Sequence, residues 1–437
     1  MKRKHMKYLK KVLVAIIATN LIAAPVATLA SNNIAAQTEQ TQLSMSELIG
    51  LILMQNGGVF NRNAASMLLQ TLGVPVTPQN VNTLMLTVSV GTAGNTAGEP
   101  VIDFFNNFAY ESTGTRIQPA SENNFSNIIG DNVGLNIRVV DIAMLGAHNS
   151  FSNNIGSNSP VDPNDAMYGN PLISLAPGFV SRLSRTQYGN AMSLLNNGVR
   201  YLDVRVTNVH GNWFTENTLI SESLSSYIWE VISFLQQNQG ELIILDFQHI
   251  SLGNASYEDF LEYIASIEVY EQNLFDFVHI NPYTSPLGTV TLGAATNDGY
   301  SSGVIILANQ PTSQYSFHFY RNENIRSRWL QQTNIHNLLG EIETEQTIIN
   351  NGDFQNRLRV SQATVTLETV GANLLRSINS WSYMFLAERF NSFLLTHDVE
   401  SWLSTTPIIM VGFAESSFRD FNEQAIERIN AFNRNLY

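Results

Sequence analysis

Residues 200–206, RYLDVRV, place two charged side chains inside an otherwise apolar run. Asp203 and Arg205 are two residues apart, and side chains with that spacing lie on the same face of a β-strand. The neighbouring valine, leucine and tyrosine residues favour a strand. Two charges on one face of such a strand predict that this face borders the polar interior or the mouth of a barrel.

Short apolar runs of the same kind recur after about residue 135. They are IRVVDIAML (137–145), ELIILDF (241–247), GVIILAN (303–309), RLRVSQATVT (357–366) and PIIMVGF (407–413). Helical stretches separate several of them, such as SESLSSYIWEVISFLQQ (221–237). Apolar strands that alternate with helices are typical of a parallel sheet covered on both faces. The pattern therefore predicts one barrel-like α/β domain over residues 135–437.

The first 30 residues have the layout of a secretory signal peptide. A basic start precedes the apolar run VLVAIIATNLIAA (12–24), and small residues end at Ala30. We therefore expect a secreted, extracellular bacterial protein, with a membrane-anchored N-terminus as the alternative. Residues 31–43 are rich in Asn, Gln and Ala and are expected to be disordered. Residues 44–134 are expected to form a small helical N-terminal extension, with capping-box spacing between Ser44 and Glu47.

The charge balance argues against nucleic acid as a partner. The whole chain has 23 Lys and Arg against 36 Asp and Glu. Without the leader, which holds six basic residues and no acid, 17 basic residues remain and the net charge is −19. Nucleic-acid binding needs clustered Lys and Arg. The chain also has no cysteine, which excludes disulfides, thiolate metal sites and cysteine nucleophiles.

Several residues with ionisable or hydrogen-bonding side chains stand where the predicted strands end. His148 lies in LGAHNSF (145–151), His210 in NVHGNWF (208–214), and Asp246, Gln248 and His249 in ELIILDFQH (241–249). Catalytic groups of parallel barrels lie at the C-terminal ends of strands. Two histidines can transfer protons to and from a reacting oxygen, and an arginine can neutralise phosphoryl charge. The alternative is structural: a hydrogen-bonded histidine and an interior ion pair.

The order of these motifs resembles the X domain of phosphatidylinositol-specific phospholipase C. The resemblance rests on AMLGAHNSF (143–151), RTQ (185–187), NNGVRYLDVRV (196–206), VHG (209–211) and GELIILDFQH (240–249), and is clear over residues 139–250. It implies a distorted TIM-type barrel that cleaves the phosphodiester between diacylglycerol and a lipid headgroup. The substrate is then a membrane phospholipid, which the protein contacts transiently.

The resemblance also implies roles for individual residues. His148 becomes the general base that deprotonates the inositol 2-hydroxyl, giving a cyclic inositol phosphate, and His210 the acid that protonates the diacylglycerol oxygen. Arg205 stabilises the phosphoryl group in the place that calcium occupies in the animal enzymes. Asp203 orients Arg205 or a histidine. Asn149, Gln248 and Asp246 are expected to bind substrate.

Two positions depart from the bacterial pattern. Asn149 stands where those members have Asp, and Gly412 where they carry the Asp that orients the first histidine. Glu415 or Asp246 could supply the missing carboxylate. The departures leave room for a catalytically impaired protein that binds phosphorylated headgroups. They also admit a phosphodiesterase for another lipid, such as a sphingolipid or a glycerophosphodiester.

Calcium is the alternative to metal-independent catalysis. Calcium-dependent relatives have Asn after the first histidine, so Asn149 and Asp203 fit two metal ligands. Tyr201 and Gln248 stand where further acids would be expected, and Arg205 would repel a cation. We therefore predict that no cofactor is required. The aromatic and basic stretch SQYSFHFYRNENIRSRW (313–329) is a candidate for contact with membrane or headgroup, if it forms a loop at the active face.

Overall fold

A curled, mostly parallel sheet organises the residues that the computed structural model describes, 134–169, 177–332, 334–366 and 383–436. Its main path runs in the order β10-β11-β12-β1-β2-β5-β8-β9. These strands are β1 (Met144–Ala147), β2 (Val199–Val209), β5 (Leu242–Ser251), β8 (Gly303–Ala308), β9 (Phe319–Tyr320), β10 (Ile325–Ser327), β11 (Leu358–Gln362) and β12 (Ile408–Val411). Within the described residues no ladder joins β9 to β10, so the sheet forms an open, distorted barrel, and the predicted fold class is confirmed.

Both faces of the sheet are buried, which explains why its strands are continuously apolar. Alternate side chains such as Met144, Tyr201 and Ile244 pack with one another inside the barrel. Their neighbours in sequence, such as Leu145 and Leu202, pack against the surrounding helices. Because successive side chains of a strand point to opposite faces, burial on both sides removes the alternation that a half-exposed strand would show.

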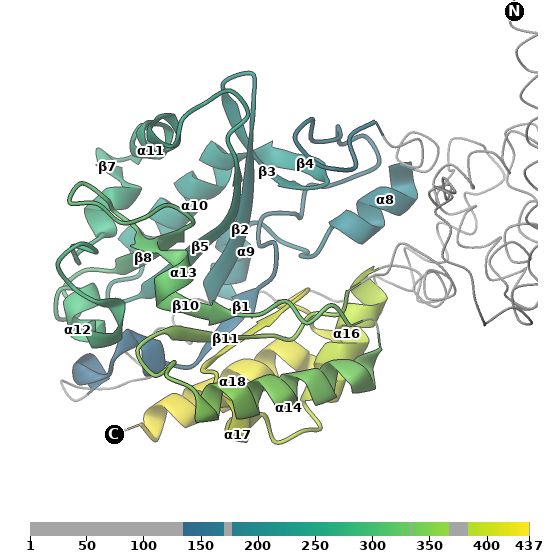
Figure 1. Ribbon diagram of the computed structural model, residues 1–437, viewed down its shortest axis with the longest axis vertical. Helices are drawn as coiled ribbons and strands as arrows, with labels where there is room; N and C mark the ends of the chain where they lie inside the picture. The colour runs from purple at the N-terminus through teal and green to yellow at the C-terminus, as the bar shows by residue number, and fades with distance from the viewer. Residues whose placement is uncertain (1–133, 170–176, 333, 367–382, 437) are drawn as a thin grey trace, which may run out of the picture.

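Most helices pack against the outside of the sheet (Figure 1), whereas the short helix Leu292–Ala295 contributes to the cluster inside the barrel and Arg321–Asn324 buries no residue. The helices are α8 (Pro177–Ser184), α9 (Ala191–Asn196), α10 (Leu224–Gln237), α11 (Tyr257–Ala265), α12 (Leu292–Ala295), α13 (Arg321–Asn324), α14 (Ile335–Asn351), α16 (Tyr383–Leu394), α17 (Val399–Leu403) and α18 (Phe421–Arg434). None of the helices in the described ranges is long and apolar enough to cross a bilayer. The predictions for residues 1–133, including the leader and most of the helical extension, lie outside the described residues.

The strands differ in length from the apolar runs that predicted them. Val139–Asp141 form a 3₁₀ turn, so β1 is a strand of only four residues. β2 continues to Val209 and turns back as a hairpin with β3 (Asn212–Asn217), which pairs with β4 (Leu219–Ser223). A separate two-stranded ribbon consists of β6 (Glu268–Val269) and β7 (Gln272–Asn273). The hairpin carries β2 well past the end of β1, which decides where its later residues lie.

A buried ion pair joins the start of β2 to the residue before β5, at the closed end of the barrel, where the parallel strands begin. Arg200 Nε donates to Glu241 Oε2 over 2.6 Å, and neither side chain is more than 2% exposed. Arg200 also donates to the carbonyl oxygens of Leu195 and Val199. These contacts compensate for the loss of water around the guanidinium, because a buried charge needs both a counter-ion and hydrogen bonds.

We expect Glu241→Ala to lower the free energy of unfolding by about 3–5 kcal/mol, because it leaves the Arg200 guanidinium without a counter-ion in the core. Urea denaturation at neutral pH measures the change. The matched control is the double variant Arg200→Met/Glu241→Leu, which should recover much of the loss. A loss below about 1 kcal/mol in Glu241→Ala would show that the two carbonyl oxygens suffice.

Candidate active site

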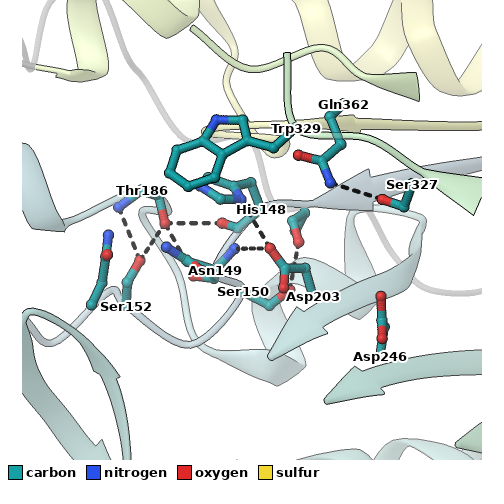
Figure 2. A network of polar contacts seen from close by, with 12 residues as sticks. His148, Asn149, Ser150, Ser152, Thr186, Asp203, Asp246, Ser327, Trp329 and Gln362 are labelled. Atoms are coloured by element: carbon teal, nitrogen blue, oxygen red, sulfur yellow. Dashed lines mark hydrogen bonds and ion pairs between the residues drawn. The ribbon is translucent and has the colours of Figure 1, made fainter. Parts of the chain in front are cut away.

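His148 and Asp203 form a hydrogen-bonded pair where β1 and β2 reach the mouth of the barrel (Figure 2). His148 Nδ1 lies 2.9 Å from Asp203 Oδ2. The aspartate side chain is fully buried, whereas 14% of the histidine side chain is exposed. If Nδ1–H donates to the carboxylate, Nε2 keeps its lone pair and can accept a proton. A carboxylate behind an imidazole fixes its orientation and tautomer, as in other acid–base dyads.

The backbone around His148 is held by three polar contacts. Its N–H donates to Val411 O on β12 over 2.9 Å. Its carbonyl oxygen accepts hydrogen bonds from Thr186 Oγ1 at 2.9 Å and Gln187 Nε2 at 2.8 Å. The RTQ motif therefore serves to fix the backbone at the histidine. Asn149 adopts a left-handed conformation with φ 42°, and its N–H donates to Asp203 Oδ2 over 3.1 Å.

Asp203 is an ionised carboxylate despite its burial. Burial alone would raise its pKa. The hydrogen bond and charge of His148, the charge of Arg205 and the Asn149 amide act in the opposite direction and lower the pKa below its ordinary value of 3.8. The negative charge is therefore available to balance a proton that His148 accepts.

Polar atoms without partners gather at this mouth. Among the described residues, the buried atoms that lack a hydrogen bond include Asn149 Oδ1, Asp203 Oδ1, Arg205 Nε, Gln248 Nε2 and Tyr383 Oη. Buried polar groups in folded proteins almost always have a partner. Acceptors and donors left open in one region therefore indicate a binding site for a polar ligand. Trp329, Ser327 and Gln362 lie at the same mouth in Figure 2.

Asp246 lies in an internal network rather than at an open surface. It accepts hydrogen bonds from Tyr201 Oη at 2.6 Å and from Arg321 Nε at 2.8 Å. Burial, opposed by the charge of Arg321, raises the pKa of Asp246. Asp246 is thus fully buried behind Arg321, whose side chain is 14% exposed, and the expected contact of Asp246 with substrate stays a prediction. The motifs did not single out Arg321, although it lies in the stretch 313–329 that is a candidate for contact with the headgroup.

The structure does not bring His210 to His148. His210 is exposed at the turn of the β2–β3 hairpin, in a left-handed conformation with φ 53°. It lies seven residues beyond Asp203 along an extended strand, a distance of roughly 23 Å. The role of proton donor implied for His210 therefore lacks the geometry that the reaction needs.

The last strand does not supply the carboxylate beside His148. Ala147 pairs with Val411, which sets Gly412 beside His148 in the next position. A Cβ at Gly412 would lie 2.7 Å from Tyr383 Oη, so this glycine makes room for the tyrosine hydroxyl. Glu415 accepts hydrogen bonds from Ser193 Oγ and the Gly189 amide. The orienting carboxylate comes instead from β2, as Asp203.

The donor set fits calcium poorly. Among the described residues, the open buried oxygens at this mouth are Asn149 Oδ1, Asp203 Oδ1 and Tyr383 Oη, whereas calcium takes about six to eight oxygen ligands. Nowhere in the described ranges do three or more His, Asp or Glu side chains gather in a metal-binding arrangement. Arg205, on the same face of β2 as Asp203, adds positive charge where a cation would have to bind.

Comparison with known proteins agrees with the resemblance. The chain is 24% identical over 218 residues to a variant-surface-glycoprotein phospholipase C of Trypanosoma cruzi, covering 47% of this chain and 56% of that protein. It is 33% identical over 120 residues to human PI-PLC X domain-containing protein 2, covering 26% and 39%. The mouse protein of that name is 26% identical over 254 residues, covering 56% and 71%. No family model matches the chain.

The chain resembles phosphatidylinositol-specific phospholipases C. A solved structure of the Staphylococcus aureus enzyme, described for the modulation of its membrane binding, superposes with a TM-score of 0.51 at 14% identity. The superposition covers 72% of this chain and 99% of that one. At this identity the likeness concerns the fold, an open TIM-like barrel. The chain spans about half the length of the trypanosomal relative and 39% of the human one.

We expect Asp203→Asn to remove a pH-dependent part of the stability. A carboxyl whose pKa is lower in the folded state stabilises the fold above its unfolded pKa, and this contribution disappears as pH falls through the folded value. The stability advantage of wild type over Asp203→Asn should therefore be present at pH 7 and shrink below about pH 3.8. Urea denaturation of both proteins between pH 3 and 7 tests this. A difference that grows on acidification would contradict the ionised assignment.

Proposed function

We propose that the chain is a phospholipase-C-type phosphodiesterase that cleaves a phosphatidylinositol-type lipid. The observation that carries the proposal is the His148–Asp203 pair, which lies beside Arg205 at the mouth of the barrel. The fold of the Staphylococcus aureus enzyme and the phospholipase relatives support the same class of reaction. The leader-like residues 1–30 support action outside the cell, at a lipid surface.

In the first step His148 acts as the general base. Its Nε2 takes the proton of the inositol 2-hydroxyl, whose oxygen attacks the phosphorus. The bond from phosphorus to the glycerol oxygen breaks, which releases diacylglycerol and leaves a cyclic inositol phosphate. Asp203 stabilises the imidazolium that forms, because its carboxylate is ionised and faces Nδ1. A positioned base of this kind contributes about 10²–10⁴-fold to the rate.

Arg205 stabilises the phosphoryl oxygens as charge develops on them. It lies two residues beyond Asp203 on the same face of β2, and its Nε is buried without a hydrogen-bond partner among the described residues. An Nε–H left open in this way can donate to a phosphoryl oxygen with little rearrangement. Asn149 Oδ1 and Gln248 Nε2, which also lack partners, offer contacts to the hydroxyl groups of the headgroup.

We expect the purified chain to release cyclic inositol phosphate from phosphatidylinositol in EDTA. His148→Ala should lower kcat by about 10²–10⁴-fold. Arg205→Lys should also be strongly impaired, because lysine cannot reproduce the planar fork of donors. Headgroup release and phosphorus NMR of the product provide the measurements, with circular dichroism as a check on folding.

Two other outcomes have defined meanings. Activity only after calcium is added would place Asn149 and Asp203 in a metal site. Headgroup binding without turnover, in EDTA and in calcium, would favour the impaired binding protein. The unpaired polar atoms at the mouth, and the glycine at position 412 in place of a carboxylate, suit a protein that binds the headgroup without cleaving it. Turnover of a sphingolipid or glycerophosphodiester instead would redirect the substrate assignment.

Exposed aromatic side chains at the mouth are the proposed contact with the membrane. Tyr315 is 80% exposed and Phe317 is 42% exposed on the loop that follows β8, and Trp329 follows β10 at the same end. Large exposed aromatics suit the boundary between lipid headgroups and acyl chains. This loop belongs to the stretch 313–329 that the sequence singles out.

We expect Tyr315→Ser/Phe317→Ser to weaken sedimentation with phosphatidylinositol vesicles by about tenfold, because it removes apolar surface from the interface. Activity on a short-chain, monomeric substrate should stay within about twofold of wild type. The control is Tyr270→Ser, which removes an even more exposed tyrosine (92%) from the β6–β7 ribbon. Equal effects of the two variants on vesicle binding would contradict the assignment of this loop.

A further inference from the structure

A second histidine–carboxylate pair lies beside Arg205. His249 Nδ1 is 3.5 Å from Glu216 Oε1. In the parallel ladder of β2 and β5, Arg205 pairs with His249. In the antiparallel ladder of β2 and β3, Val206 pairs with Thr215, and one further step sets Glu216 opposite Arg205. The imidazole and the carboxylate thus flank the arginine from the two neighbouring strands.

A bulge in β5 makes this arrangement possible. Val204 pairs with Phe247, but the next residue, Arg205, pairs with His249, so Gln248 is the extra residue. Without the bulge Gln248 would face Arg205, and His249 would point to the helix-covered side, because side chains alternate along a strand. The bulge therefore turns an imidazole toward the mouth, at the level of the arginine.

The two partners are exposed to very different degrees. The Glu216 side chain is 4% exposed, and its Oε2 accepts a hydrogen bond from the Thr218 amide at 2.9 Å. The His249 side chain is 58% exposed. The carboxylate is thus fixed within the fold, while the imidazole that it holds by Nδ1 presents Nε2 to solvent. This combination suits a group that exchanges protons with a bound molecule.

The surrounding charges favour the protonated imidazole. The hydrogen bond to Glu216 raises the pKa of His249, burial lowers it, and the Glu216 charge raises it again. Arg205 on β2 lowers this pKa and Asp162, in the loop after β1, raises it, with the net result above the ordinary value of 6.5. A histidine that keeps its proton near neutral pH can serve as an acid.

The separation from His148 suits a shared substrate. His148 follows β1 at the level of Asp203, and His249 lies on β5, two strands away and two residues nearer the mouth, at the level of Arg205. Strand spacing and rise place the two backbones roughly 12 Å apart. Two imidazoles and one phosphoryl group fill such a span, with Arg205 between them.

We propose that His249 is the proton donor to the leaving oxygen and that Glu216 is its positioning residue. This inference rests on the proposed function. As the phosphorus–glycerol bond breaks, the Nε2 proton of His249 passes to the glycerol oxygen, giving neutral diacylglycerol and neutral His249. His148 meanwhile holds the proton of the attacking hydroxyl. Exchange of these two protons with water restores both histidines.

The test compares two leaving groups. Phosphatidylinositol releases an alkoxide that needs a proton, whereas the 4-nitrophenyl ester of inositol 1-phosphate releases a phenolate that does not. We expect His249→Gln to lower kcat on phosphatidylinositol by about 10²–10⁴-fold and on the nitrophenyl ester by less than about tenfold. His148→Gln should impair both substrates. His279→Gln, at a histidine bonded to Ser302 O before β8, is the matched control and should stay near wild type.

The pH profile provides a second readout, on the positioning residue. Activity that needs protonated His249 falls as pH rises through its pKa. Glu216→Gln removes the main cause of the raised pKa, so this fall should move to lower pH, with folding unchanged. In His249→Gln the fall should disappear from the residual activity.

The outcomes separate this inference from the proposed function. Equal losses on both substrates in His249→Gln would overturn the donor role and leave the phosphodiesterase intact. Loss in His210→Gln on phosphatidylinositol alone, with His249→Gln unaffected, would return the role to the hairpin histidine. A wild-type chain that cleaves neither substrate would remove the proposed function, and the donor role with it.

Discussion

The buried carboxylate of Asp203 is the constraint on which the mouth of the barrel depends. Its side chain is fully buried, so its charge must be balanced by neighbouring groups of the protein. His148 comes from the end of β1, the Asn149 amide from the turn beyond it, and Arg205 from the same face of β2. The aspartate thus fixes the orientation of the imidazole and the path of the chain that leaves β1.

The open polar atoms around this carboxylate have a cost in stability. Asp203 Oδ1, Arg205 Nε and Tyr383 Oη are buried without partners among the described residues, and each such group is expensive to desolvate. The two apolar layers inside and outside the sheet, together with the Arg200–Glu241 pair at the closed end, compensate for it. The sheet is thus closely packed at the end where the strands begin, whereas its other end, at the mouth, carries open polar atoms that can bind a ligand.

Much of the fold could be read from the sequence, because burial on both faces leaves a direct mark on strand composition. His148, Asp203 and Arg205 were also accessible, since each stands at or near the end of an apolar run. Which carboxylate faces His148 stayed open between Asp203, Glu415 and Asp246, because the choice depends on the register between β1 and β2. The distance of His210 from the site depends on the length of the hairpin, and the network of Asp246 depends on Arg321, which is remote in sequence.

The bulge in β5 decides which side chain lies opposite Arg205 at the mouth of the barrel. One inserted residue decides whether an amide or an imidazole faces the arginine, while the strands below continue undisturbed. A deletion of His249 would leave the packed layers nearly intact, set Gln248 opposite Arg205 and exchange an ionisable side chain for a neutral one. The loss or gain of such a residue offers this barrel a short evolutionary route between catalysis and simple recognition of a phosphorylated headgroup.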